Sequence, residues 1–152
     1  MDKSNKTRVV IFDLDGTLAD VSRRRKILQQ TPKAWDAFFA DMDSDPPNPP
    51  IVELYKVLEA SRLYSMYVVT GRPERYREVS ARWISFQGLK AERLFMRIDG
   101  DKREDHIIKM EILNEIRASG EEIAFVVDDR ESVVKMWREN GVTCLQCDYW
   151  ND

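Results

Sequence analysis

The chain has 152 residues, 43% of them hydrophobic and 34% charged, a composition that suits one folded domain over residues 1–152 and excludes wholesale disorder. Its formal net charge of −3 gives no general attraction to nucleic acid, so any such contact requires a local basic patch. The hydrophilic start lacks an apolar signal core, and the apolar runs are far shorter than the roughly 20 residues of a membrane span. We therefore expect a soluble, cytoplasmic protein without membrane contact.

Short apolar runs with β-branched residues predict buried strands. They cover residues 9–12, 66–69, 94–98, 123–127 and 143–146. Between these runs, apolar residues recur at the spacing of amphipathic helices. The four stripes are Ile51, Leu54, Tyr55 and Leu58; Tyr76, Val79, Trp83 and Phe86; Ile108, Ile112 and Ile116; and Val133, Val134 and Trp137. This alternation predicts a three-layer α/β/α sandwich of Rossmann-like topology with a central, mostly parallel sheet.

Residues 20–50 interrupt the alternation, and we expect them to form a short cap-like insertion after the first strand. Within this segment, Trp35, Phe38, Phe39 and Met42 have helical spacing. We expect the aromatic side chains to cover the core or the mouth of a site, in preference to serving as a platform for stacked bases. The basic run "RRRK" just before them favours contact with a phosphate backbone.

Polar side chains follow three of the predicted strands. In an open parallel sheet, ligands bind beyond the carboxyl ends of the strands, so the residues at those ends are candidates for a site. They are Asp13, Asp15, Gly16 and Thr17 after the first strand, Thr70, Gly71 and Arg72 after the second, and Asp128 and Asp129 after the fourth. Lys109 lies on the helix that precedes the fourth strand. We expect all of them to converge at one edge of the sheet.

This set of side chains fits phosphoryl transfer to a carboxylate. Asp13 would attack phosphorus as a nucleophile, which divides hydrolysis into two easier steps. Asp15 would protonate the leaving oxygen and later deprotonate water. Thr70 and the Gly71 amide suit the phosphate oxygens, while Lys109 neutralises the charge that develops.

Paired acids at the end of a buried strand repel each other and lose hydration, so a bound cation is needed to offset the cost. Mg²⁺ prefers oxygen ligands, and we predict it as the cofactor because it would also bridge a phosphate and an incoming carboxylate. The predicted metal-binding acids are Asp13, Asp15, Asp128 and Asp129. Cys144 and Cys147 form a lone CxxC pair without two further zinc ligands, and we expect them to take no part in the site.

Four motifs resemble those of the haloacid dehalogenase superfamily of phosphohydrolases. They are "DLDGT", "VVTGR", Lys109 and "VVDDR", in this order along the chain. The resemblance implies that Asp13 is the nucleophile and that Asp15 is the general acid and base. It also implies that Asp128, supported by Asp129, is a metal ligand.

Longer stretches narrow the resemblance. The segments "NPPIVELYKVL", "ARW", "GDKREDHIIKMEI" and "VVDDRESVVKMWRENGVTC" are similar to the 3′-phosphatase domain of bacteriophage polynucleotide kinase/phosphatases. The spacing in that family favours Lys109 over Lys102 as the catalytic lysine. The family surrounds its substrate with arginines, and the matching positions here are Arg24, Arg72 and Arg97, with Arg23 and Arg25 nearby.

The resemblance implies a Mg²⁺-dependent phosphatase that hydrolyses the 3′-phosphate ends of polynucleotides through an aspartyl-phosphate. A nucleotidase or a phosphatase of small metabolites in the same superfamily is the alternative enzyme. A receiver-type regulatory domain also combines acids, Thr and Lys, but it carries its phosphorylated Asp after the third strand, whereas the acids here follow the first and fourth. The chain lacks the GxxxxGK[ST] loop of a kinase, so we expect a kinase or ligase partner on a separate chain.

Overall fold

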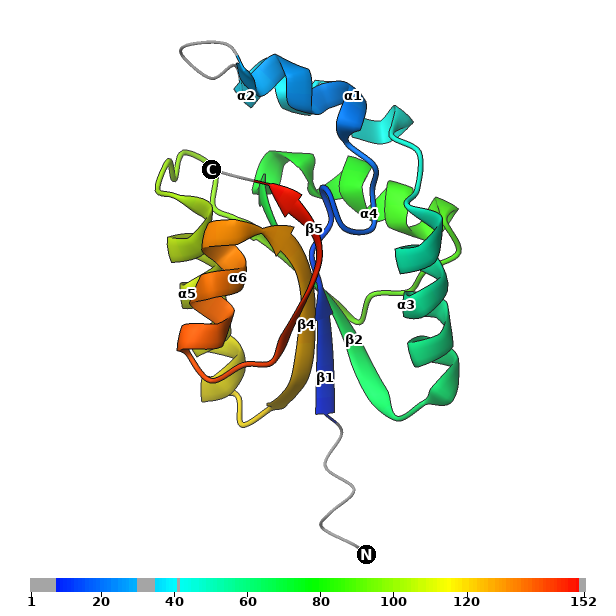
Figure 1. Cartoon of the computed structure of the whole chain (residues 1–152), viewed down its shortest axis with the longest axis vertical. Coiled ribbons are helices and arrows are strands. Elements are labelled where there is room, and N and C mark those ends of the chain that lie inside the picture. Colours follow the sequence, from blue (N-terminus) through cyan, green and yellow to red (C-terminus); the bar gives the residue numbers. More distant parts are fainter. Residues whose placement is uncertain (1–7, 30–34, 41, 151–152) are drawn as a thin grey trace, which may run out of the picture.

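The computed structural model describes residues 8–29, 35–40 and 42–150 (Figure 1), so the predicted insertion over residues 20–50 is described except at the two gaps. The described residues form a five-stranded parallel sheet in the order β3-β2-β1-β4-β5. The strands are β1 (Arg8–Phe12), β2 (Tyr64–Pro73), β3 (Arg93–Arg97), β4 (Glu122–Arg130) and β5 (Cys144–Trp150). Because all five run in one direction, their carboxyl ends meet at the same edge.

Helices cover both faces of this sheet (Figure 1). The larger ones are α3 (Pro49–Ser61) and α4 (Arg77–Phe86) on one face, and α5 (Asp105–Ala118) and α6 (Glu131–Glu139) on the other. The predicted three-layer fold is therefore confirmed. None of the helices among the described residues combines the length and hydropathy needed to cross a membrane.

The side chains of β1 alternate between two hydrophobic clusters, as the two-residue period of a strand requires. Val10 and Phe12 are buried on the side of α3, where Phe12 meets Tyr55 edge-on with ring centroids 5.0 Å apart. Val9 and Ile11 are buried on the opposite side with the apolar residues of α5 and α6. The central strand is thus buried on both faces, which fixes the position of the residues that follow it.

Two strands run further than the sequence predicts. β2 continues to Pro73 and β4 continues to Arg130. Beyond Val69 in β2 and Asp128 in β4, pairing with the outer strands changes register. Such irregular pairing re-aims side chains at the end of a strand. The predicted site residues of both strands lie at these irregular ends.

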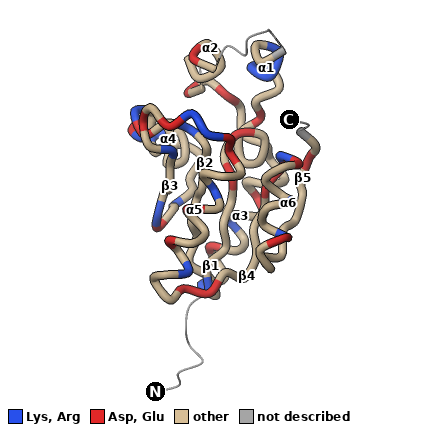
Figure 2. The backbone as a smooth tube through the Cα atoms, turned by 90° about the vertical axis from the view of Figure 1, so that its left-hand side faces the viewer, with Lys and Arg blue, Asp and Glu red and all other residues tan. Residues whose placement is uncertain are grey.

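The insertion folds above the carboxyl edge of the sheet, where acidic and basic segments are interleaved (Figures 1 and 2). Its elements are α1 (Ser22–Arg25), a 3₁₀ turn (Lys26–Gln29), α2 (Trp35–Phe39) and a second 3₁₀ turn (Met42–Ser44). Phe38, Phe39 and Met42 are buried in the cluster that contains Phe12. The expectation that the aromatic segment covers the core is confirmed for these three, whereas Trp35 is 36% exposed.

The predicted helical stripe that ends at Phe86 is wrong at that residue. Phe86 is the last residue of α4 and is 86% exposed, while Trp83 and Ile84 are buried. The chain turns at Gly88, which has a φ of 76° that favours glycine, and Leu89 returns to the core instead.

The burial of α5 gives a test of the core. Leu113 is fully buried, and we expect Leu113→Ala to lower the free energy of unfolding by about 2–5 kcal/mol because it leaves a cavity in close-packed surroundings. Leu63 is 67% exposed, so Leu63→Ala should change the same quantity by less than about 0.5 kcal/mol. Urea unfolding followed by circular dichroism measures both, and equal losses would contradict the packing of α5.

Candidate active site

The loop after β1 places Asp13 at the centre of the site. The Asp13 amide donates to the Val127 carbonyl of β4 at 3.0 Å, so the end of β1 stays attached to the sheet. The chain then turns at Gly16, whose φ is 84°, and a Cβ there would overlap the carboxylate of Asp129. Glycine is therefore needed for both the backbone conformation and the close approach. This turn brings "DLDGT" against the end of β4.

Asp13, Asp128 and Asp129 form a buried acidic cluster whose ligand atoms lie within 4.8 Å of one another. Lys109 Nζ donates to Asp13 Oδ1 at 2.8 Å and to Asp128 Oδ2 at 3.0 Å. Thr17 Oγ1 lies 3.3 Å from a carboxylate oxygen of both Asp13 and Asp129. The structure thus brings together five residues that the sequence placed on three separate elements.

The acidic cluster carries more negative charge than its surroundings stabilise. Burial, followed by repulsion from Asp128, raises the pKa of Asp13 well above its usual value, although Lys109 opposes the shift. Burial and Asp128 likewise raise the pKa of Asp129 to about 7. Burial alone would lower the pKa of Lys109, but Asp128 and Asp13 outweigh it and the pKa is raised, so the lysine is charged. A further cation would relieve the remaining repulsion.

The donor set of the cluster fits a divalent metal ion. Its ligand atoms are carboxylate oxygens, which hard cations such as Mg²⁺ prefer. Two contacts orient Asp128, since its Oδ2 accepts from Trp137 Nε1 at 3.2 Å and its Oδ1 accepts from the Asp129 amide at 2.8 Å. The sequence placed Trp137 on the apolar stripe of a predicted helix, and the structure adds this orienting role, for which the sequence had no signal.

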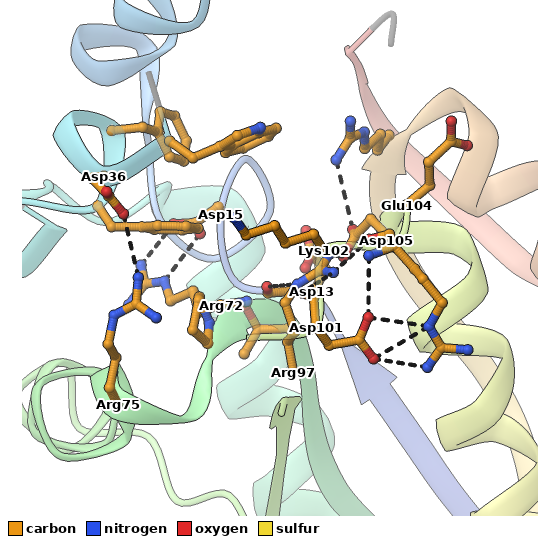
Figure 3. Close-up of a pocket in the computed structure, with 18 of the residues that line it drawn as sticks. Asp13, Asp15, Asp36, Arg72, Arg75, Arg97, Asp101, Lys102, Glu104 and Asp105 are labelled. Atoms are coloured by element: carbon orange, nitrogen blue, oxygen red, sulfur yellow. Dashed lines mark hydrogen bonds and ion pairs between the residues drawn. The ribbon is translucent and has the colours of Figure 1, made fainter. Parts of the chain in front are cut away.

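Asp15 lies outside the cluster and faces two arginines. Arg72 donates to both of its oxygens, at 3.0 and 2.6 Å (Figure 3). Arg24 Nη2 donates to Oδ1 at 2.9 Å. Burial alone would raise the pKa of Asp15, but the two guanidinium groups outweigh it and hold the pKa below its usual value. The predicted use of this carboxylate as a metal ligand therefore gains no support from the geometry.

Arg24, which the family resemblance places near the substrate, is buried and is not among the residues that line the cavity at Asp13. Its side chain is 1% exposed, pairs with Asp45 and Asp15, and donates to the Phe38 carbonyl. The acidic end of the insertion folds back over the arginine and neutralises it. Arg24 therefore orients Asp15 from behind instead of facing the solvent. Arg25, also predicted nearby, donates to Asp129 at 2.8 Å.

A cavity of about 1010 Å³ opens above Asp13 (Figure 3). Its lining includes Asp13, Asp15, Thr70, Gly71 and Arg72 together with Asp129. The insertion contributes Trp35, Phe38 and Phe39 to the same lining. Besides Arg72, five further cationic residues line it, namely Arg75, Arg97, Lys102, Arg103 and Arg130. The predicted residues Thr70, Gly71, Arg72 and Arg97 are thus placed around one space with Asp13.

Three of these cationic residues were missed by sequence reasoning. Arg75, Arg103 and Arg130 each follow a predicted motif or a predicted strand within a few residues, and that proximity was the available signal. Lys102 lines the cavity and is exposed, while Lys109 is buried among the acids, so the two lysines occupy different places.

Asp105 is a further residue that the sequence analysis missed. A Cβ at Gly71 would overlap its carboxylate, which explains the glycine in "VVTGR". Asp105 lies 3.7 Å from Lys109 Nζ, 3.5 Å from Arg97 and 3.9 Å from Arg130. It therefore links the lysine of the acidic cluster to the cations at the cavity wall.

The two cysteines are free thiols on β5. Cys147 Sγ lies 3.7 Å from Thr17 Oγ1, next to the site, but belongs to no metal-binding group among the described residues. Burial raises the pKa of both thiols to about 12, so neither is a thiolate at neutral pH.

A protein-family model described as the phosphatase domain of polynucleotide kinase PNKP matches residues 7–151. The chain belongs to this family. It is therefore a phosphatase domain of the haloacid dehalogenase superfamily, a hydrolase of phosphoric monoesters, as the four motifs predicted.

Solved structures and a curated relative agree with this membership. A chain in the Pnkp1/Rnl/Hen1 complex is 32% identical with a TM-score of 0.81, and the match covers 99% of this chain and 48% of that one. A protein of Autographa californica nuclear polyhedrosis virus, described as a bifunctional polynucleotide kinase/RNA ligase, is 26% identical over 87% of this chain and 18% of its own length. The chain thus spans less than half of either relative.

More distant structures share the fold alone. The class C acid phosphatase of Bacillus anthracis is 14% identical with a TM-score of 0.70, over 97% of this chain and 69% of that one. A haloacid dehalogenase-like hydrolase of Streptococcus pneumoniae is also 14% identical, with a TM-score of 0.65 over 93% and 84% of the two chains.

The crowding of the acidic cluster can be tested with Asp13→Asn. A raised pKa means that the charged carboxylate is less favourable in the folded protein than in the unfolded chain, so it lowers stability at any pH above its usual pKa. We expect the metal-free variant to unfold at a higher temperature than the wild type at pH 8 and to gain less stability from added MgCl₂. Thermal unfolding in EDTA and in MgCl₂ measures both effects.

Asp43→Asn is the matched control, because Asp43 is exposed and lies outside the acidic cluster. It should leave both transition temperatures unchanged. A metal-free Asp13→Asn protein that is less stable than the wild type would contradict the repulsion inferred for the cluster.

Proposed function

We propose that this phosphatase removes the phosphate from the 3′ ends of polynucleotides, with Mg²⁺ as its cofactor and Asp13 as the nucleophile. The observation that carries the proposal is the position of Asp13 on the wall of a cavity that is also lined by Thr70, Gly71 and six cationic residues. A cavity of this size exceeds what a phosphate group needs, since cavities of roughly 300–1,000 Å³ enclose whole small molecules.

In the first step, an Asp13 oxygen attacks phosphorus, the bond to the leaving 3′ oxygen breaks, and an aspartyl-phosphate forms. Asp15 supplies the proton that the leaving oxygen takes up. In the second step Asp15 accepts a proton from water, whose oxygen attacks phosphorus and releases Asp13 and inorganic phosphate. Thr70 and Gly71 line the same cavity as Asp13, and the Thr70 hydroxyl and the Gly71 amide would bind the phosphate oxygens.

Charge neutralisation supports this sequence of steps. Lys109 Nζ donates to Asp13 Oδ1 at 2.8 Å, and Thr17 Oγ1 lies 3.3 Å from Oδ2, so both oxygens of the nucleophile are held in position. Mg²⁺ held by Asp13, Asp128 and Asp129 would shield the attacking carboxylate from the phosphate dianion. Arg25 and Thr17 keep Asp129 in place beside that cluster.

The contacts of Asp15 define its protonation during the cycle. With Arg72 and Arg24 in contact its pKa is low, so it carries the charge needed to accept a proton from water. A bound phosphate dianion adds negative charge beside it, which raises the pKa toward the protonated form needed in the first step. The same residue then serves both steps because substrate binding changes its surroundings.

The choice of a polynucleotide end rests on family membership and on the relatives. The model that matches this chain describes the phosphatase domain of a polynucleotide kinase. One relative is named for kinase and RNA ligase activities, and another is part of an RNA repair complex. We propose that this chain likewise works with a kinase or ligase and that residues 20–50 act as its cap. Membership in a phosphatase family disfavours the receiver-type alternative.

Replacement of Asp15 tests its assignment as the proton donor. Asp15→Asn should lower kcat/KM for a 3′-phosphorylated sugar by about 10²–10⁴-fold, because a sugar alkoxide leaves only when protonated. An activated aryl phosphate has a stable leaving group and should lose less. Parallel initial-rate assays on the two substrates measure the difference, and equal losses would count against the role.

A second test concerns the dependence of turnover on the chain length of the substrate. We expect kcat/KM for 3′-phosphates to rise from a mononucleotide to a short oligonucleotide and to fall with added salt, because the cations at the wall bind the phosphates that follow the end. Lys102→Ala should reduce the preference for the oligonucleotide, since Lys102 lines the cavity and is exposed. Initial rates on both substrates at several salt concentrations measure these effects.

Lys135→Ala is the matched control, because Lys135 is exposed on α6 and does not line the cavity. It should leave the preference unchanged. Equal kcat/KM for all chain lengths, together with better turnover of 5′-nucleotides, would replace the proposed activity with that of a nucleotidase.

A further inference from the structure

Trp35 stands apart from the other aromatic residues of the insertion. Phe38, Phe39 and Met42 are buried, with at most 9% exposure, whereas Trp35 is 36% exposed and lines the cavity that holds Asp13. A residue needed only to cover the core would be expected to bury its ring. The indole instead forms part of the wall of the space in which the phosphate would react.

The indole is held in place by other aromatic rings. It lies nearly parallel to Phe39, with ring centroids 6.0 Å apart and an interplanar angle of 25°, and meets Phe38 edge-on at 5.6 Å. Phe39 in turn lies 5.3 Å from Tyr76, which precedes α4. These contacts anchor the exposed ring to the core, so that little conformational freedom is lost when a ligand stacks on it.

Charged side chains also connect this part of the insertion to the carboxyl edge of the sheet, where Asp13 lies. Asp36, the neighbour of Trp35, lies 3.3 Å from Arg75 of the segment after β2 (Figure 3). The guanidinium of Arg130, directly after Asp129, lies 5.9 Å from the centroid of the Trp35 ring. The indole is therefore next to a cation that follows the acidic cluster in the chain.

We propose that Trp35 binds the terminal nucleobase of the substrate by stacking. This inference rests on the proposed function and deepens it, because it names a second group of the substrate that the site recognises. A flat aromatic surface accepts any base, since every base has a π-face. The cations of the wall complement the phosphates, while the indole complements the one apolar, planar part of a nucleic-acid end. Recognition of the end would thus be independent of sequence.

The test compares two 3′-phosphorylated oligonucleotides that differ only in the last residue, one with a base and one abasic. We expect the wild type to prefer the end with a base by about 10- to 100-fold in kcat/KM, the range that stacking of one base supports. Trp35→Ala should abolish this preference, because kcat/KM should fall for the end with a base far more than for the abasic end. Trp35→Phe keeps an aromatic ring and should retain most of the preference.

Phe86→Ala is the matched control, because Phe86 is an exposed aromatic residue that does not line the cavity. It should leave the preference unchanged. Equal losses on both oligonucleotides in Trp35→Ala would show that the indole only supports the cap, and an unchanged preference would show that it does not touch the base. Either result would overturn the inference.

Binding without turnover separates this inference from the proposed function. In the Asp13→Asn background, a nucleoside 3′-monophosphate should quench tryptophan fluorescence, and Trp35→Phe should remove the quenching. If the nucleotide does not quench the fluorescence of the Asp13→Asn protein that keeps Trp35, the inference is overturned whatever the turnover assays give. Intact quenching in a wild type that leaves 3′ ends unhydrolysed would overturn the proposed activity alone.

Discussion

The structure depends on three carboxylates held within 4.8 Å of one another in a buried place. Burial and mutual repulsion oppose this arrangement, and Lys109 offsets only part of it, as the raised pKa of Asp13 shows. Other parts of the fold must therefore supply the free energy that offsets the remaining repulsion and loss of hydration. They do so by placing the acids at the ends of strands whose bodies are buried on both faces, so that the packing of the sheet holds the charges together.

The convergence of the site could be predicted because it follows from strand ends. Asp13, Thr70 and Asp128 each come directly after an apolar run. A parallel sheet brings the residues at such positions to one edge, independently of how their side chains interact. The choice of Lys109 over Lys102 came from the family resemblance, and the structure buries Lys109 on α5 beside Ile108 and Ile112. Backbone topology was therefore sufficient for the residues at the strand ends but did not by itself identify the lysine.

Side-chain pairing could not be predicted in the same way. The chain has 24 basic and 27 acidic residues, and sequence alone does not say which of them meet. Arg24 is buried because Asp45, 21 residues further on, folds back onto it. Phe86 is exposed because the turn at Gly88 lets Leu89 fill the core. The burial of Arg24 and the exposure of Phe86 both depend on contacts between elements, and these cannot be predicted from the local sequence pattern.

The pairing of Arg24 connects the insertion to the chemistry of the sheet. Asp15 is held by Arg72 from β2 and by Arg24 from α1, and Arg24 is held in turn by Asp45 of the insertion. A displacement of the insertion that separates Arg24 from Asp15 removes one of the two cations that lower the pKa of this carboxyl group. The insertion therefore influences the protonation of Asp15 as well as the shape of the cavity, because one segment contributes both Arg24 and Trp35.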